Sequence, residues 1–382
     1  MKDIEKELLF PKTEYRRRLS NLREQMAEHD IEVLVCADRE NIFYLSGYQT
    51  LGDNYQMLIV PMEGEPTLVL RYLESMLAAR HACTCDVERW DDTDDPVEVT
   101  VNALRRRDLL KRVVGIEEQS VYLQVSTWQR LKVVIPELVD GSGLVERCRA
   151  VKSPLEIDAM RRAAELTVKG MKAAMDTIRE GVTENDIAAA AFDAMTRAGS
   201  EYLTDDPIIT SGDRAGIPHT SYMRRKLQPG DTVLLELSAV YHRYHAPLMR
   251  GAVVGEPSPE IETMAEVCID ALNAALAAVR PGATSGEVDE ACRTIITENG
   301  YWENFRKRTG YSVGCGLTTW GEGHLVSLKE DDPTELVPGM CFHIPPALRL
   351  YGRAGMGWSE TVTVTDSGVD ILTDFPRRLF IC

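Results

Sequence analysis

The sequence predicts two domains, an α/β domain over residues 1–150 and an α+β domain over residues 151–382. Helical patterns alternate with short apolar runs in the first part, which is typical of an α/β layer. Beyond Pro154 the pattern becomes helical over long stretches. A helix-Gly-Thr-helix pattern then occurs twice, as REGVTENDIAAA and as VRPGATSGEVDEA. Such an internal repeat indicates a pseudo-twofold domain with helices outside a curved sheet.

The first domain is expected to begin with a helix over residues 13–28, where Tyr15, Leu19, Leu22 and Met26 recur at helical spacing. The run VLVC at 33–36 predicts a strand. Further strands are expected at 55–60, 66–71 and 113–115, and further helices near 73–80 and 97–111. The charged segment 146–154 is expected to link the domains, because Pro154 interrupts regular structure.

The second domain is expected to hold two helix pairs, at 155–179 with 184–198 and at 258–279 with 284–299. Gly residues follow several of these helices, as expected for helix ends. Between the pairs, a Pro-Gly-Asp turn at 229–231 precedes the apolar strand TVLL, which continues directly into Glu236.

Composition excludes several classes of function. The chain has 382 residues, 44% of them hydrophobic, and a formal net charge of −17. Nucleic acid and anionic membranes both require a positive surface, so neither is an expected partner. No apolar run approaches the roughly 20 residues of a membrane span, and the nine scattered cysteines indicate reduced thiols. We therefore expect a cytoplasmic protein. The strongly acidic net charge favours an origin in a halophile; the alternative is that many bacterial enzymes are acidic without being halophilic.

The segment 207–251 concentrates the candidate chemistry. The turn SGDRAGIPH ends at His219, and Glu236 interrupts an apolar strand. A carboxylate inside an apolar strand is costly unless it is paired or used. Facing each other across a pocket, the two side chains would form an acid/base or nucleophile pair. The alternative is a histidine that caps a loop and a glutamate on an edge strand.

These motifs resemble those of the creatinase, aminopeptidase P and prolidase superfamily. The resemblance rests on SG…PH followed by LQPGDTVLLE, and on GYSVGCGL, ELVPGMCFHIPPAL and SETVTVTDSG further along, in the same order as in the family. It covers nearly the whole chain. It implies a creatinase-type N-terminal domain followed by a catalytic domain with the pita-bread fold.

Metal-dependent members of this superfamily hold two divalent ions with two Asp, one His and two Glu. The matching positions here are Glu236, Pro247, a residue beside His324, Pro345, and either Ser359 or Glu360. A two-metal site needs hard oxygen ligands on both ions, and a proline side chain offers none. We therefore expect no metal ligands and no cofactor.

The superfamily also has metal-free members, and the resemblance to these implies a catalytic set of His219, Glu236 and Glu360. The arrangement is most similar to the ectoine hydrolases, which open the ring of a cyclic amidine to an N-acetylated diaminobutyrate. By this resemblance Glu236 would attack or orient water at the amidine carbon, and His219 would move protons. Carboxylates suit a cationic amidinium because they form charge-assisted hydrogen bonds with it.

Seven further residues are candidates for substrate binding. Each has an ordinary alternative: a surface ion pair for an arginine, core packing for an aromatic side chain, and a turn cap for a carboxylate. The candidates are Tyr48, Asp213, Arg214, Arg250, Glu322, His324 and Trp358.

Three classes of function remain open. The first is a metal-independent hydrolase of a small amidine or guanidine such as ectoine. The second is a creatinase-like amidinohydrolase or an atypical Xaa-Pro peptidase, and the third is an inactive pita-bread protein that only binds partners. The resemblance also implies a homodimer.

Overall fold

The computed structural model describes residues 5–52, 54–83 and 85–382. The chain forms two compact units, Met1–Arg149 and Ala150–Cys382. Each unit has a hydrophobic core of its own. Within the described residues, no helix is both long and apolar enough to cross a membrane.

The N-terminal unit is a six-stranded mixed sheet with strand order β4-β3-β2-β1-β5-β6. The central strand β1 pairs antiparallel with β2 and parallel with β5. The strands are β1 (Val33–Cys36), β2 (Met57–Pro61), β3 (Thr67–Arg71), β4 (Asp86–Trp90), β5 (Val114–Ile116) and β6 (Leu138–Asp140). The helices are α1 (Lys12–Glu28), α2 (Arg39–Ser46), α3 (Ser75–His81), which follows the 3₁₀ turn η1 (Tyr72–Glu74), α4 (Pro96–Arg106), α5 (Val125–Val134) and α6 (Leu144–Ala150). This architecture confirms the expected α/β class.

The segment expected to be an irregular link is largely helical. Helix α6 covers Leu144–Ala150. Pro154 does not interrupt structure but begins the next helix, α7 (Pro154–Thr177). Proline is favoured at the first helical position because its missing N–H has no partner there. Ser153 and Glu156 complete the start as a reciprocal capping box.

The C-terminal unit consists of two helix pairs, a four-stranded mixed sheet, a five-stranded antiparallel sheet and two two-stranded antiparallel sheets. The first half contains α7, α8 (Glu184–Ala198), β7 (Ile208–Ser211), the 3₁₀ turn η2 (Gly212–Gly216), β8 (Thr232–Leu237), β9 (Val240–Tyr241), β10 (Tyr244–His245) and β11 (Leu248–Val253). The second half contains α9 (Pro259–Ala278), α10 (Ser285–Glu298), η3 (Trp302–Asn304), β12 (Gly310–Ser312), β13 (Ser327–Leu328), β14 (Cys341–Ile344), β15 (Ala347–Leu350), β16 (Ala354–Gly357), β17 (Glu360–Thr365), β18 (Gly368–Ile371) and β19 (Phe380–Ile381). The sheet orders are β19-β11-β8-β7 and β13-β12-β14-β17-β18.

The two halves of this unit repeat the same local structure, as the sequence repeat predicts. Helices α8 and α10 both begin with a threonine N-cap in a capping box. The glycines before them, Gly181 and Gly282, have φ of 81° and 79°. Their N–H groups donate to Leu227 O at 2.9 Å and Leu336 O at 3.0 Å. Each leucine begins an L-x-P-G turn that leads into a central strand, β8 in one half and β14 in the other.

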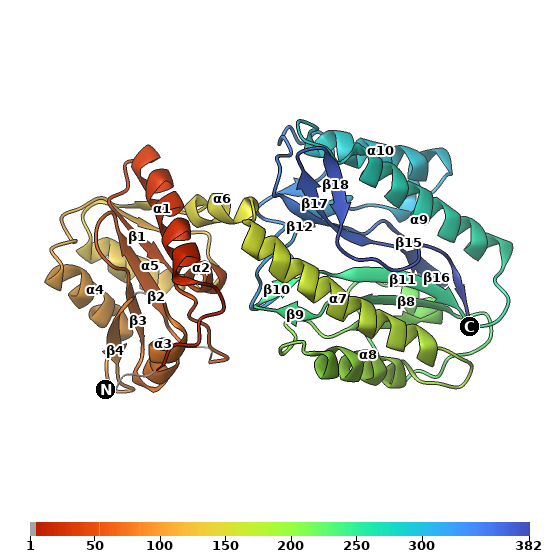
Figure 1. Cartoon of the computed structure of the whole chain (residues 1–382), viewed down its shortest axis with the longest axis horizontal. Coiled ribbons are helices and arrows are strands. Elements are labelled where there is room, and N and C mark those ends of the chain that lie inside the picture. The colour runs from red at the N-terminus through yellow and green to blue at the C-terminus, as the bar shows by residue number, and fades with distance from the viewer. Residues whose placement is uncertain (1–4, 53, 84) are drawn as a thin grey trace. The chain divides into compact units, whose positions relative to one another are not determined.

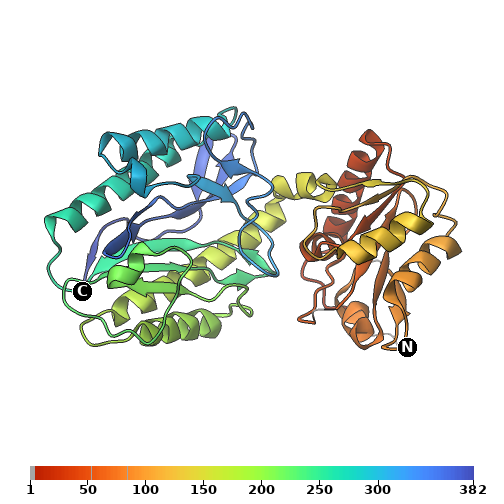
Figure 2. The ribbon, with the colours of Figure 1, turned by 180° about the vertical axis from the view of Figure 1, so that it is seen from behind.

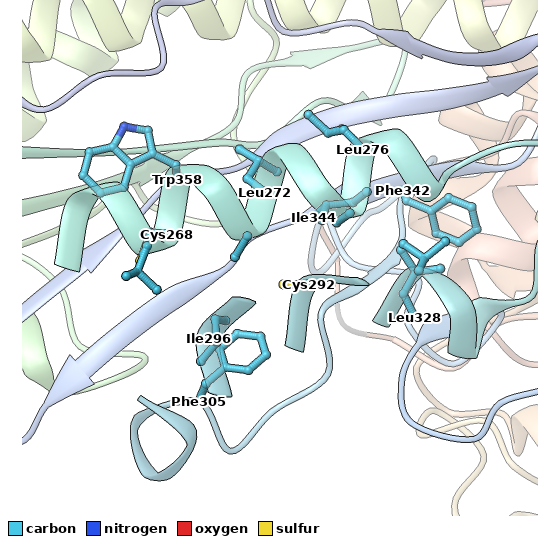
Figure 3. Packing of buried hydrophobic residues seen from close by; sticks show 14 of the residues in the cluster. Cys268, Leu272, Leu276, Cys292, Ile296, Phe305, Leu328, Phe342, Ile344 and Trp358 are labelled. Atoms are coloured by element: carbon cyan, nitrogen blue, oxygen red, sulfur yellow. The ribbon is translucent and has the colours of Figure 1, made fainter. Parts of the chain in front are cut away.

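Alanine-rich helix faces cover the strands of the unit. One core packs α7 and α8 against β7, β8 and β11, and a second packs α9 and α10 against the sheet that contains β14 and β17. Figure 1 shows the two helix pairs on opposite sides of the strands, and Figure 2 shows the same arrangement from behind. Leu272 and Leu276 of α9 lie in the second core with Phe342 and Ile344 of β14 (Figure 3).

Candidate active site

Glu236 lies on β8, the central strand of the first half. It pairs with Ile208 of β7 and with Met249 of β11. Because side chains alternate along a strand, Val233, Leu235 and Leu237 face the helices while Glu236 faces the other way. Glu236 is only 8% exposed, so the turn and strand deliver one carboxylate to the inner face of the sheet.

That face borders a cavity of about 550 Å³ within the C-terminal unit. Glu236, His219, Tyr311, Lys307 and Arg349 all contribute to its lining. The volume falls in the range of small-molecule binding sites. Two of the three residues predicted to be catalytic, His219 and Glu236, therefore share one cavity.

The surroundings of Glu236 change its acidity. Burial raises the pKa of its carboxyl to about 6, although the positive charges of Arg349 and Lys307 lower it. Burial also lowers the pKa of the Lys307 ammonium to about 8, even though much of this side chain borders the open cavity. At neutral pH the cavity thus contains a carboxylate that is mainly ionised and a lysine that is mainly charged.

A buried histidine on β14 lies behind Glu236. His343 Nδ1 is 3.9 Å from Glu236 Oε1 and 3.0 Å from the Tyr311 hydroxyl. His343 Nε2 lies 2.7 Å from Ser359 Oγ. Burial and the charge of Lys307 hold the pKa of His343 well below its usual range, so its contact with Glu236 is not an ion pair at neutral pH. These groups form a fixed polar wall next to the carboxylate.

His219 is at the exposed tip of the loop that follows η2. Its φ of 56° is left-handed, which is uncommon for a side chain larger than glycine. Arg214 secures this loop by pairing with the buried Glu184 and by donating to Thr220 Oγ1 at 3.1 Å. Arg214, predicted to bind substrate, therefore supports the loop that presents His219. Within the described residues no ion pair joins His219 to Glu236, so their proposed cooperation requires a ligand or water between them.

Glu360, the third predicted catalytic residue, does not line the cavity. Its carboxylate accepts a hydrogen bond of 2.7 Å from Arg250 Nη2 and another from Thr373. Glu360 pairs with Ile344, whose side chain lies in the helix-side core, whereas the preceding residue, Ser359, contacts His343. Neighbouring residues on a strand face opposite sides of a sheet, so a shift of one position decides which of them reaches the site.

Arg250, predicted to bind the substrate, is buried and fully used by the fold. It donates to Glu360 and to the carbonyls of Met249, Ser359, Phe375 and Pro376. Its strand partner is Leu235, which faces the helices, so Arg250 points away from the Glu236 side. We correct the prediction for this residue.

Trp358 and Glu322 are also structural. Trp358 is fully buried in the core beside α9 (Figure 3), and its indole N–H donates to Arg378 O at 3.2 Å. Glu322 is 2% exposed and accepts a hydrogen bond of 2.8 Å from Lys152 Nζ. Neither belongs to the cavity lining.

The other three candidates lie apart from the cavity lining. Asp213 and His324 are exposed residues, one within η2 and one before β13. Tyr48 is buried in the N-terminal unit.

Sequence reasoning missed the cationic part of the site. Lys307 and Arg349 line the cavity, and both act electrostatically on Glu236. The basic triplet at 306–308 in a chain of net charge −17 was the available signal. The sequence around Arg349 contains no comparable cluster of basic residues that would have drawn attention to it. His343 was visible only as a neighbour of Pro345.

The donor set does not fit the two metal ions implied by the resemblance. Pro247 and Pro345 occupy two of the positions at which the resemblance places ligands, and the positive charges of Lys307 and Arg349 act on the carboxylate that is present, Glu236. In the part of the chain that the structure describes, no group of three or more His, Cys, Asp or Glu residues is arranged to hold a metal ion. Positive side chains beside a single carboxylate oppose the binding of a divalent cation.

Comparison with known proteins identifies relatives along the whole chain. Residues 158–366 match the Metallopeptidase family M24, and residues 18–151 match the Creatinase/Prolidase N-terminal domain. The ectoine hydrolase of Halomonas elongata is 28% identical, with 99% of this chain and 100% of the relative covered. The Xaa-Pro dipeptidase of Pyrococcus furiosus is 29% identical over 95% of this chain and 99% of its own.

A solved structure shows the same architecture. Dipeptidase PepE from Mycobacterium ulcerans superimposes with a TM-score of 0.86 at 27% identity, covering 97% of this chain and 99% of that one. This confirms the predicted fold, a creatinase-type N-terminal domain followed by a pita-bread catalytic domain.

Proposed function

Because the chain belongs to the Metallopeptidase family M24 and carries a Creatinase/Prolidase N-terminal domain, we propose that it is a hydrolase that cleaves a C–N bond of a small molecule without a divalent metal. The observation that carries this proposal is the presence of one buried carboxylate, Glu236, in the same cavity as the cations Lys307 and Arg349, which act on it electrostatically. A metal-dependent relative would need several carboxylates at this place.

The substrate we propose is ectoine or a closely related cyclic amidine. An amidinium is planar, cationic and delocalised, and Glu236 can bind it by charge-assisted hydrogen bonds. The full-length similarity to the Halomonas elongata ectoine hydrolase supports this substrate, and the similar match to Xaa-Pro dipeptidases keeps a peptidase as the second candidate.

In the proposed reaction, the Glu236 carboxylate attacks the amidine carbon or orients the water that does so. One ring C–N bond then breaks, and its nitrogen leaves as an amine after taking up a proton. Water supplies the oxygen of the acetamide carbonyl, either by adding directly to the amidine carbon or by hydrolysing the ester formed with Glu236, which regenerates the carboxylate. His219 is suited to move the proton because it borders the cavity from a solvent-exposed loop. The Tyr311 hydroxyl, held by His343 and by the Trp320 indole at 3.1 Å, is a fixed hydrogen-bond donor or acceptor at the cavity wall.

The deciding experiment offers metal-stripped protein ectoine, creatine and an Xaa-Pro dipeptide, each in the presence of a chelator. We expect ectoine to be converted to an N-acetylated diaminobutyrate, with far less than one divalent ion per chain by elemental analysis. If dipeptide cleavage appears only after manganese, cobalt or zinc is added back, the peptidase is the correct function. Absence of turnover on all three substrates would favour a binding protein.

We also propose that the enzyme is a cytoplasmic homodimer. Apolar side chains on η1 and α3 of the N-terminal unit support an interface, because Tyr72, Leu73 and Met76 are 58%, 67% and 55% exposed. Light scattering on the eluting protein should give twice the mass of 42.7 kDa.

A further inference from the structure

Lys307 and Arg349 line the cavity, and backbone carbonyls hold both side chains. Lys307 Nζ donates to Pro345 O at 2.6 Å, and Arg349 Nη1 donates to Ala215 O at 2.8 Å. Among residues 5–52, 54–83 and 85–382, neither side chain forms an ion pair within 4.0 Å. Both are thus fixed by neutral carbonyls, and the Glu236 carboxylate, which lies beyond ion-pair distance, offsets only part of their charge.

The other two arginines of the lining are engaged elsewhere. Arg306 forms an exposed ion pair of 2.5 Å with Glu303. Arg308 donates to Ser327 Oγ at 2.8 Å and lies over the Tyr311 ring, 4.7 Å from its centroid. Arg306 therefore has a paired charge, whereas Arg308, like Lys307 and Arg349, has no carboxylate within 4.0 Å in the described part of the chain. Lys307 and Arg349 are distinguished from Arg308 because both act electrostatically on Glu236.

The position of these two cations has an electrostatic cost. Desolvation lowers the pKa of the half-buried Arg349 and of Lys307, although the Lys307 side chain is itself exposed at the cavity, and the ionised Glu236 offsets only part of this effect. The described lining has four Lys and Arg side chains but only two carboxylates, in a chain whose net charge is −17. This excess of positive side chains in the lining of an otherwise acidic protein is explained if the cavity binds an anionic group.

We infer that Lys307 and Arg349 bind a carboxylate of the substrate while Glu236 faces its cationic C–N centre, so that the cavity selects small zwitterions. The ammonium has three N–H donors and gives one to Pro345, and the guanidinium has five and gives one to Ala215. The remaining donors suffice for charge-assisted bonds to both oxygens of a carboxylate. This inference rests on the proposed function, since it places the substrate's anionic group opposite the reacting carbon.

The arrangement makes a specific demand on the substrate. Ectoine carries both an amidinium and a carboxylate, so it can satisfy both sides of the cavity at once. A neutral amide of the same ring would leave Lys307 and Arg349 without a counter-charge. The cavity would then discriminate against a ligand without a carboxylate mainly because that ligand leaves the two cations unpaired.

The test compares ectoine with its carboxamide in the parent enzyme and in Lys307→Met, Arg349→Met and Arg306→Met variants. For ectoine we expect KM to rise by about 10- to 100-fold in the first two variants, the usual effect of losing a charge-assisted hydrogen bond, with a smaller change in kcat. For the carboxamide we expect a weak KM that these two variants leave unchanged. Arg306→Met is the matched control, because its charge is already paired.

Equal changes in KM for ectoine and for its carboxamide would overturn the inference, as would no change for either. If Lys307→Met does not fold, the Arg349→Met comparison alone decides. If the parent enzyme does not open ectoine, the proposed function fails and acetate becomes the probe. A rise in melting temperature with acetate that is present in the parent and in Arg306→Met, but lost in Lys307→Met, would support the anion site; an equal shift or none in all three would refute it.

Discussion

Replacing Glu236 by glutamine should stabilise the protein while it inactivates the enzyme. Burial raises the pKa of this carboxyl to about 6 from the ordinary value of 4.5. A folded-state pKa above the unfolded value means that the folded protein holds the proton more tightly. Ionisation of Glu236 therefore costs stability, and this cost appears as the pH rises from about 4.5 to about 6 and is fully present at pH 7.

The size of the effect follows from the same two values. A difference of about 1.5 in pKa corresponds to about 2 kcal/mol at pH 7 and to almost nothing at pH 4. Glutamine has nearly the same shape and no charge, so Glu236→Gln should gain up to about this amount. Turnover should fall by roughly a hundredfold or more, as it does when one preorganised electrostatic group is lost.

The assay is urea unfolding of the parent and of Glu236→Gln at pH 4, 5, 6 and 7, followed by tryptophan fluorescence. Glu303→Gln is the matched control, because Glu303 also borders the cavity but is exposed and paired with Arg306. The control should change stability little at any of these pH values. The reasoning is refuted if Glu236→Gln unfolds at lower urea than the parent at pH 7, or if its advantage is the same at pH 4 and pH 7.

Three further predictions concern the same unit. The pH profile of kcat/KM should be a bell, rising as Glu236 loses its proton with a pKa of about 6 and falling as Lys307 loses its charge with a pKa of about 8; a flat profile from pH 5 to pH 9 would contradict both roles. Arg250→Met should lower the free energy of unfolding by about 3 kcal/mol, because it removes the closest cation from the buried Glu360 and leaves it with Thr373 and the more distant Arg377; any variant that remains folded should keep its KM in steady-state kinetics. His219→Ala should reduce turnover by roughly a hundred- to ten-thousandfold with no change in melting temperature, since this side chain is exposed; activity near the parent rate would remove it from the mechanism.

Much of the fold could be predicted because it depends on local chemistry. Thr183 and Thr284 begin their helices with the reciprocal cap that a threonine and an acidic residue three positions on provide. Gly181 and Gly282 adopt left-handed backbone conformations that favour glycine. Glu236 was likewise predictable, because a single charge at the end of an apolar strand is conspicuous in the sequence.

The rest of the site could not be predicted because it depends on register and on distant contacts. Glu360 and Ser359 differ by one position, yet the first pairs with Arg250 in the interior and the second contacts His343. A sequence motif without gaps does not resolve a shift of one residue, and in a strand that shift reverses the direction of the side chain. Lys307 and Arg349 come from two separate segments of the chain, and only folding places both around Glu236.

The two halves of the C-terminal unit relate the position of Glu236 to that of Pro345. Glu236 follows Leu227 of the first L-x-P-G turn by nine residues, and Pro345 follows Leu336 of the second by the same number. The repeat therefore places an ionisable side chain at one of two equivalent positions and a proline at the other. In a two-metal enzyme the positive charge that balances such carboxylates comes from bound ions. Here Lys307, bound to the carbonyl of that same Pro345, brings positive charge to the site from the chain itself. If this charge has taken over the role of a metal, chelators should leave turnover intact, whereas Lys307→Met should reduce it. Loss of turnover with a chelator together with unchanged turnover in Lys307→Met would show that the charge of Glu236 is balanced by another source.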